Sequence, residues 1–297
     1  MNQFIELCIS GISLGFVYAL VALGFVMIFK ATRVVNFAHG SLVLLGAYLI
    51  ARLHEGGMAF LPAVLIGVVC TALTSVIIEV AILRRLRGAS LDILAICTIG
   101  VNIILITELT RRIGTNVLNI GDPWGEHVTH FGSFAVPQAR VAAAIVAVIL
   151  LGGFIAMHQF SDFGIAMRSA ADDGEAAALM GIRLNRVAAA SWAVAGALAA
   201  VGGIFFTTFP TPGVDASVGL SALAAFPAAI LGGLDSIAGA VVGGLIIGIV
   251  VTLTAGYQDE LSFLGRGLSD VMPYVVMTAV LLVRPWGLFG TRELTRV

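Results

Sequence analysis

Long apolar runs follow one another along the chain, and the charged residues gather in the short segments between them. Most runs approach the roughly 20 residues that an α-helix needs to cross a membrane. They also lack the alternation of polar and apolar residues that marks a membrane-spanning β-strand. The pattern predicts an all-α polytopic membrane protein with about nine passes, within a range of eight to ten. The expected passes are Ile5–Phe29, Phe37–Ala51, Phe60–Leu83, Leu91–Leu109, Val141–Phe160, Val187–Phe209, Leu220–Leu234, Ile237–Tyr257 and Leu268–Val283.

The connections between these runs are too short to hold a second folded domain. We therefore expect residues 1–297 to form a single transmembrane domain. The longest hydrophilic connection on the expected inner side covers residues 161–186.

Lysine and arginine in short loops set the orientation, because they are retained on the cytoplasmic side of a membrane. With the N-terminus outside, eleven of the sixteen basic residues fall on the inner side: Lys30, Arg33, Arg84, Arg85, Arg87, Arg168, Arg183, Arg186, Arg284, Arg292 and Arg296. The other five, Arg52, Arg111, Arg112, Arg140 and Arg266, fall outside. This asymmetry predicts an outer N-terminus and an inner C-terminus.

The second and seventh expected passes are short and contain small or helix-breaking residues, such as Pro227 in the seventh. Interrupted helices at matching places in two halves of a chain indicate a transporter built from inverted repeats. The alternative is two helices that packing alone has shortened, and the seventh pass can also be re-entrant. Glycines at helix-contact spacing, such as Gly11 with Gly15 and Gly244 with Gly248, predict close packing of helices within the chain, and the alternative is contact with another subunit.

Composition narrows the classes of function further. Hydrophobic residues make up 59% of the chain and charged residues 11%, and the net charge is −1, so no basic surface is left for nucleic acid. Cys8, Cys70 and Cys97 lie inside apolar runs and read as small hydrophobic residues, which predicts no disulfide framework and no metal site. We find no pattern for an intramembrane enzyme and expect no cofactor.

The deepest polar residues of the expected spans are uncharged. Thr98 and Asn102 share one helix face, and Asn36, His39 and Ser41 stand at the start of the broken second pass. They are candidates to line a substrate pathway, and the alternative for each is a hydrogen bond that only supports packing. The acidic residues lie near span ends instead, and Glu79 is expected to reach Arg84 or Arg85 at the inner interface.

Residues 161–186 predict two short helices in a loop on the inner side. Ser161 or Asp162 is a suitable N-cap, Gly174 interrupts the helical pattern, and Gly181 is a natural C-cap. Such a pair of helices would protrude from the membrane, and the alternative is a solvated loop that only joins two passes.

Several motifs in a fixed order carry a family resemblance. They are VNFAHG at Val35–Gly40, LLGAY at Leu44–Tyr48, LRGAS at Leu86–Ser90, AILGG at Ala229–Gly233, SIAGA at Ser236–Ala240 and RPWGLFG at Arg284–Gly290. Together they resemble the LivH-type permease subunits of the branched-chain amino-acid ABC importer family. Ser41 and Trp286 stand where the family often has glutamate and glutamine, which leaves the choice of substrate open among related small molecules.

The resemblance implies a permease subunit in a bacterial inner membrane that imports an amino acid of the branched-chain type, another amino acid, an amide or urea. It implies a second permease subunit, identical or LivM-like, an extracytoplasmic binding protein and two ATPase subunits. The loop at 161–186 would dock into the ATPase through Arg168, Ala170, Asp172, Asp173, Glu175, Ala177 and Gly181.

Two alternatives to an ABC permease remain, a secondary transporter and a passive channel. The chain lacks the GxxxxGK[S/T] loop that binds nucleotide phosphates, since its single lysine is Lys30. ATP would therefore be hydrolysed on a separate subunit. A secondary transporter predicts a carboxylate in the middle of a span, and a channel would not need the protruding inner loop.

Overall fold

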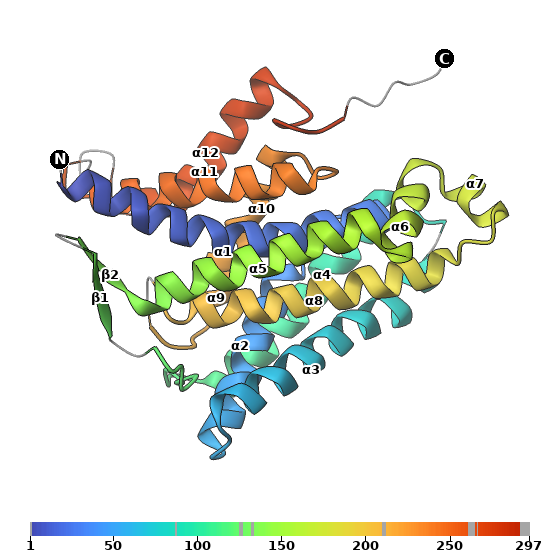
Figure 1. The fold of residues 1–297 in the computed structure, drawn as a ribbon. Coiled ribbons are helices and arrows are strands. Elements are labelled where there is room, and N and C mark those ends of the chain that lie inside the picture. Colours follow the sequence, from blue (N-terminus) through green and yellow to red (C-terminus); the bar gives the residue numbers. More distant parts are fainter. Residues whose placement is uncertain are drawn as a thin grey trace.

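The computed structural model describes residues 2–86, 88–124, 127–131, 134–209, 212–260, 265 and 267–291. Arg87, Arg266, Arg292 and Arg296, which entered the orientation argument, lie outside the described residues. The helices are α1 Asn2–Thr32, α2 His39–Glu55, α3 Phe60–Ala81, the 3-10 turn η1 Leu83–Leu86, α4 Leu91–Ile113, α5 Gln138–Phe160, α6 Asp162–Asp172, α7 Gly174–Leu179, α8 Leu184–Phe206, α9 Ser217–Leu223, α10 Ala225–Gly232, α11 Ile237–Gly256 and α12 Leu268–Val283 (Figure 1).

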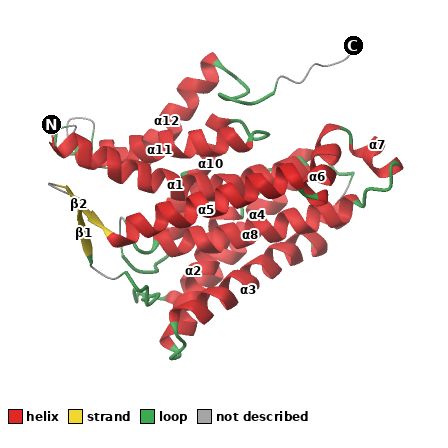
Figure 2. Ribbon diagram, in the orientation of Figure 1, coloured by secondary structure: helices red, strands yellow, loops and turns green. Residues whose placement is uncertain are grey.

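The prediction of a helical polytopic membrane protein is confirmed. Within the described residues, six helices are long and apolar enough to cross a membrane, namely α1, α3, α4, α5, α8 and α11. Figure 2 shows one addition to the helical plan, a small antiparallel hairpin of β1 Val128–Phe131 and β2 Phe134–Pro137 before α5. Sequence reasoning missed this hairpin, because its strands of four residues each are too short for a clear alternating pattern.

Helices α1 and α8 form the centre of the bundle. Of their most apolar stretches, 83% and 67% of the residues are buried within the chain, against 17% to 39% for α3, α4, α5 and α11. Helix α1 packs against α5, α8, α10 and α11, and α8 packs against α1, α2 and α3. The outer helices leave large apolar side chains exposed, as expected for surfaces that face lipid or another subunit.

The close contact between α1 and α11 is made by glycines. A Cβ atom on Gly15 would stand 2.7 Å from the Cα of Leu245, and one on Gly11 would stand 2.7 Å from the Cα of Ile249. Gly244 and Gly248 present the opposing surface, against Ala19 and Gly15. Without hydrophobic attraction between helices in lipid, such close backbone approach supplies the packing energy. The prediction that these glycines pack within the chain is confirmed.

The second pass begins two residues later than predicted. Phe37 is not helical, and α2 starts at His39. The backbone amide of Phe37 donates to Thr98 Oγ1 at 3.1 Å, and that of Ala38 donates to Asn36 Oδ1 at 3.0 Å. These side-chain acceptors replace helical partners and hold the segment between α1 and α2 in a non-helical course.

The expected seventh pass is divided into α9 and α10, which meet at Ala224. After α10 the chain turns at Gly233, where φ is 107°. The amides of Leu288 and Phe289 donate to the carbonyls of Leu231 and Gly232, at 2.8 and 2.9 Å. The RPWGLFG motif thus caps the end of α10. It forms one structural unit with the AILGG motif, which lies far from it in the sequence.

The C-terminal end of α3 carries an ion pair with a buried carboxylate. Glu79 is 1% exposed, and its carboxylate accepts two hydrogen bonds from Arg84, at 3.2 and 2.5 Å. Arg84 also donates to the carbonyl of Asn185 at the start of α8, at 3.2 Å. The prediction that Glu79 reaches an arginine at this end is confirmed.

Replacement of Glu79 by glutamine is therefore expected to lower the free energy of unfolding by about 3 kcal/mol, the low end of the range for breaking a buried pair. Thermal unfolding in detergent measures the change. Glu55→Gln is the control, because the Arg52–Glu55 pair is exposed, with side-chain exposures of 55% and 37%, and exposed pairs contribute at most about 1 kcal/mol. Equal losses in the two variants would contradict the expectation.

Candidate translocation cavity and coupling segment

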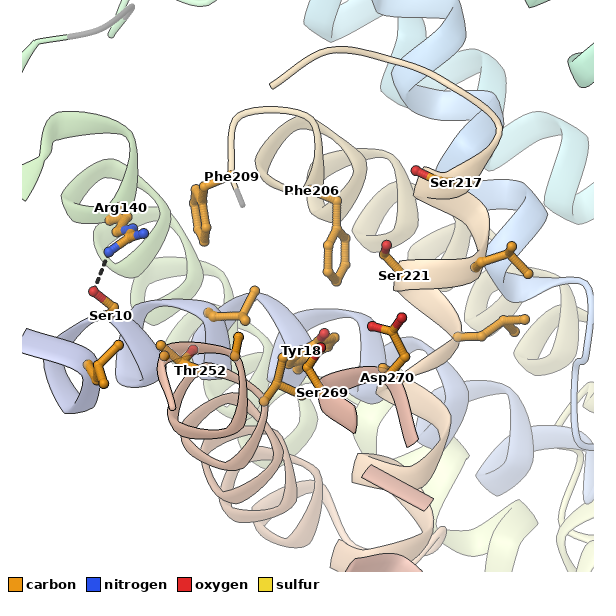
Figure 3. A pocket seen from close by; sticks show the side chains of 18 of the residues that line it. Ser10, Tyr18, Arg140, Phe206, Phe209, Ser217, Ser221, Thr252, Ser269 and Asp270 are labelled. Atoms are coloured by element: carbon orange, nitrogen blue, oxygen red, sulfur yellow. Dashed lines mark hydrogen bonds between the residues drawn. The ribbon is translucent and has the colours of Figure 1, made fainter. Parts of the chain in front are cut away.

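A cavity of about 750 Å³ opens between α1, α5, α8, α9, α11 and α12. Figure 3 shows that side chains from all these helices point into it, among them Tyr18, Arg140, Phe206, Phe209 and Asp270. Its lining includes the first turns of α1 and α5 and the end of α8, which lie at the end of the bundle that holds the N-terminus and the hairpin, opposite α6 and α7 (Figure 1). Six segments that are distant in the sequence build this site.

Polar groups occupy two separate places in the cavity wall. Arg140 donates a hydrogen bond to the hydroxyl of Ser10, and its guanidinium lies 5.9 Å from the ring centre of Phe209. Asp270 lies near Tyr18, with Ser221 on the neighbouring wall (Figure 3). Between the two places the lining is mostly apolar. No ion pair joins Arg140 and Asp270, both of which the structure describes.

The structure brings four of the five predicted pathway residues together, at the broken start of α2. Asn36, His39, Ser41 and Thr98 are each at most 1% exposed. Asn102 lies one helical turn beyond Thr98 and is half-buried. Among the described residues that line the 750 Å³ cavity, none is one of these five.

Their hydrogen bonds differ in kind. Thr98 accepts from the amide of Phe37, which joins α4 to the α1–α2 connection, and it donates its single hydroxyl proton to the carbonyl of Ala95 at 2.8 Å. Ser41 donates to the carbonyl of Ala38 at 2.8 Å. By contrast, Asn36 Nδ2 and His39 Nδ1 are buried without a hydrogen-bond partner among the described residues. Two of the five such buried atoms among the described residues thus lie at the start of α2, and the others belong to Ser75, His158 and Trp192.

The segment of α6 and α7 is built by its caps. Ser161 Oγ accepts from the amide of Gly164 at 3.1 Å, and Asp173 Oδ1 accepts from that of Ala176 at 2.9 Å. The break therefore falls at Asp173, one residue before the predicted Gly174. Gly181 has a φ of 89° and ends α7 as predicted.

Two backbone hydrogen bonds close α7. The amide of Gly181 donates to Ala178 and that of Ile182 donates to Ala177, both at 3.0 Å. This is the Schellman pattern, which needs a left-handed residue that glycine adopts without strain.

Other predicted coupling residues are placed differently from expectation. Ala177 is 4% exposed, so it packs inside the segment instead of lying on its surface. Arg168 donates to the carbonyl of His158 and forms no ion pair with Asp172, the partner that helical spacing suggests. Ala170 is half-buried, and Asp172, Asp173 and Glu175 are exposed.

The most exposed large apolar residues of this segment lie near its end, and Ile165 on α6 is exposed to a smaller degree, at 51%. Leu179 is 89% exposed and Met180 is 85% exposed. The sequence signal for them was weak, because a leucine and a methionine beside a C-cap normally pack inward.

Besides the packing of α6 against α1, α5 and α8, one side-chain hydrogen bond joins the α6–α7 segment to the connection after α1. The guanidinium of Arg33, just after α1, donates to the carbonyl of Ala171 in α6 at 2.7 Å. Arg33 has a φ of 57°, which is unfavourable for a residue with a side chain. A movement of α6 would therefore pull on Arg33 and displace the connection between α1 and α2.

Comparisons with known proteins agree with this architecture. Residues 7–283 match the family described as the permease component of the branched-chain amino acid transport system. The chain is 31% identical over 309 residues to the high-affinity branched-chain amino acid transport system permease protein LivH of Escherichia coli K12, covering 99% of this chain and 98% of that protein. It is 27% identical over 313 residues to the corresponding permease BraD of Pseudomonas aeruginosa, with the same coverage.

A relative from a third organism also matches over most of the chain. The chain is 31% identical over 280 residues to a probable branched-chain amino acid transport permease protein LivH of Methanocaldococcus jannaschii, covering 91% of this chain and 88% of that protein. No solved structure matches the chain. A family match across nearly the whole bundle, with the cavity, the broken helices and the α6–α7 segment inside it, places this chain in the family of permease components of branched-chain amino acid transport systems.

Proposed function

We propose that this chain is the membrane-spanning permease subunit of an ABC importer that moves branched-chain amino acids across the bacterial inner membrane. The family match over residues 7–283, with relatives named as high-affinity branched-chain amino acid permeases, carries the proposal. The permease is not itself an enzyme, and ATP is hydrolysed on separate ATPase subunits.

Nine crossings with an outer N-terminus are the topology that we propose. The six long helices supply six of them, and α2, the α9–α10 pair and α12 supply the other three. Contacts between helix ends support the alternation of the passes: the end of α11 lies beside the start of α1 at Gly256 and Leu7, and Arg84 after α3 reaches Asn185 at the start of α8. The hairpin lies at the end with the N-terminus, and α7 lies at the opposite end (Figure 1).

The packing also supports inverted repeats made of α1–α4 and α8–α12. Helix α1 packs against α10 and α11 of the second half, and α8 packs against α2 and α3 of the first. Each half thus places its long first helix against the broken and following helices of the other. We propose that the broken start of α2, with Asn36, His39 and Ser41, borders the inner part of the pathway, and that Thr98 and Asn102 support it.

The partners follow from this arrangement. Two ATPase subunits would bind at the inner end through α6 and α7, using the exposed face of Asp172, Glu175, Leu179 and Met180. A binding protein would deliver substrate at the outer mouth of the cavity. A second permease subunit, identical or LivM-like, would cover exposed apolar helix faces.

Reconstitution tests the proposal. The permease is purified with its ATPase, second permease and binding protein, placed in proteoliposomes, and supplied with labelled leucine outside and ATP at the ATPase side. We expect leucine uptake that requires both ATP and the binding protein. Excess valine should compete, whereas urea and acetamide should not.

A secondary transporter is the competing function. Leucine uptake driven by a proton or sodium gradient in vesicles without ATP would support that reading and contradict ours. The placement of acidic groups argues against it, since the deeply buried Glu79 is already paired with Arg84.

A further inference from the structure

The outer cavity has the size and the lining of a binding site for a small molecule. Cavities of about 300–1,000 Å³ with apolar walls and a few polar groups are typical ligand sites, and this one measures about 750 Å³. Its apolar walls include Leu14, Phe206, Leu220 and Leu223. The ring of Phe206 is fixed against that of Tyr18, with centres 5.4 Å apart.

The two polar places in the wall are too far apart to hold one amino acid together. Ser10, which bonds Arg140, precedes Tyr18 by eight residues on α1, which corresponds to about 12 Å along the helix. The nitrogen and the carboxyl carbon of an α-amino acid are only about 2.5 Å apart. Arg140 is in addition already bonded to Ser10 and lies beside Phe209. A charged group of the substrate that binds at Asp270 would therefore be held without help from Arg140.

Asp270 presents a carboxylate where the apolar walls converge. It is exposed to the cavity and lies near Tyr18, with Ser221 and Ser269 also in the lining (Figure 3). An ionised carboxylate only accepts hydrogen bonds, and hydroxyl oxygens can accept as well. The group that best satisfies such a cluster is a small cation with several N–H donors.

An amino acid offers that cation, whereas urea and simple amides do not. A charge-assisted hydrogen bond from an ammonium group is about twice as strong as one from a neutral amide, and partial exclusion of water strengthens it. The apolar side chain of the same molecule would lie against Phe206 and the leucines.

We propose that Asp270, together with the hydroxyls of Tyr18 and Ser221, forms a binding site for the α-ammonium group of the transported amino acid in the outer cavity. The inference rests on the proposed import function and names the residue that selects amino acids over uncharged amides. Substrate released by the binding protein is held here before it moves inward.

The test uses the complete complex in proteoliposomes with leucine as the probe. Asp270→Asn removes the charge and keeps the size, Asp270→Glu keeps the charge, and Asp259→Asn removes an exposed outer carboxylate that is not part of the cavity lining. Leucine import and ATP hydrolysis are measured in parallel, and assembly is checked by copurification of the ATPase.

We expect Asp270→Asn to import at least tenfold less leucine per ATP hydrolysed, with assembly and ATP hydrolysis unchanged. Asp270→Glu should recover much of the import, and Asp259→Asn should match the wild type. The inference would be overturned if Asp270→Asn imported as much leucine per ATP hydrolysed as the wild type. It would also be overturned if Asp270→Asn and Asp270→Glu lost leucine import equally. Failure of the wild-type complex to import leucine would instead refute the proposed function, independently of Asp270.

Discussion

Replacement of Gly181 by valine is expected to abolish uptake while membrane insertion and expression stay near normal. Gly181 ends α7 at a φ of 89°, and a residue with a Cβ pays about 1–2 kcal/mol in that region. Helix α7 has only six residues, which is too short to be stable without its caps. The strain should therefore unfold α7 and remove the surface that we assign to the ATPase, whereas the long apolar helices remain unchanged.

Gly88→Val is the matched control. Gly88 also has a positive φ, of 97°, and open space around its Cβ position, but it lies in a different connection, between α3 and α4, which the proposed topology also places inside. Uptake of labelled leucine and copurification of the ATPase are measured for both variants. Normal transport by Gly181→Val together with loss in Gly88→Val would place the docking site on the α3–α4 connection.

A second substitution separates docking from local unfolding. The sequence alone pointed to Ala177 as a surface position, but Ala177 is buried, so a bulky residue there would disturb the segment itself. Leu179 is 89% exposed, and Leu179→Asp keeps the capped helix while it removes an apolar contact. We expect this variant to lose ATPase association as well.

The elements were predictable where one local signal decides. Continuous apolar runs placed the long helices within a few residues, and the C-cap at Gly181 was correct because the left-handed position requires glycine. The start of α2 was misplaced because a hydrogen bond from the backbone of Phe37 to Thr98, a residue 61 positions away, decides it.

The arrangement of the helices was not predictable from hydropathy. Helices α1 and α3 are equally apolar, yet α1 is 83% buried in its most apolar stretch and α3 only 28%. Lipid tails are as apolar as a leucine side chain, so a lipid-facing helix and a central helix have the same composition. The cavity escaped prediction for a related reason, since Tyr18, Arg140 and Asp270 come from three helices and share no motif.

The largest loss of stability is expected where two backbones touch, at the contact of α10 with α11. A Cβ atom on Gly243 would overlap the carbonyl oxygen of Ala228 and stand 3.1 Å from the amide nitrogen of Gly232. Both neighbours are backbone atoms, so no side chain can move aside. The C-terminal motif also holds α10 in place through hydrogen bonds from Leu288 and Phe289 to its last carbonyls.

Gly243→Val should therefore lower the free energy of unfolding by at least about 3 kcal/mol, the upper end of the usual range for an overpacked core. The isolated subunit in detergent should unfold at a much lower temperature or fail to accumulate. Gly153→Val is the control, because Gly153 also lies inside a long helix but has open space at its Cβ position. Its melting temperature should stay near that of the wild type. Equal melting temperatures of the two variants would contradict this expectation. They would mean that α10 can move away from α11 in spite of the hydrogen bonds that cap it.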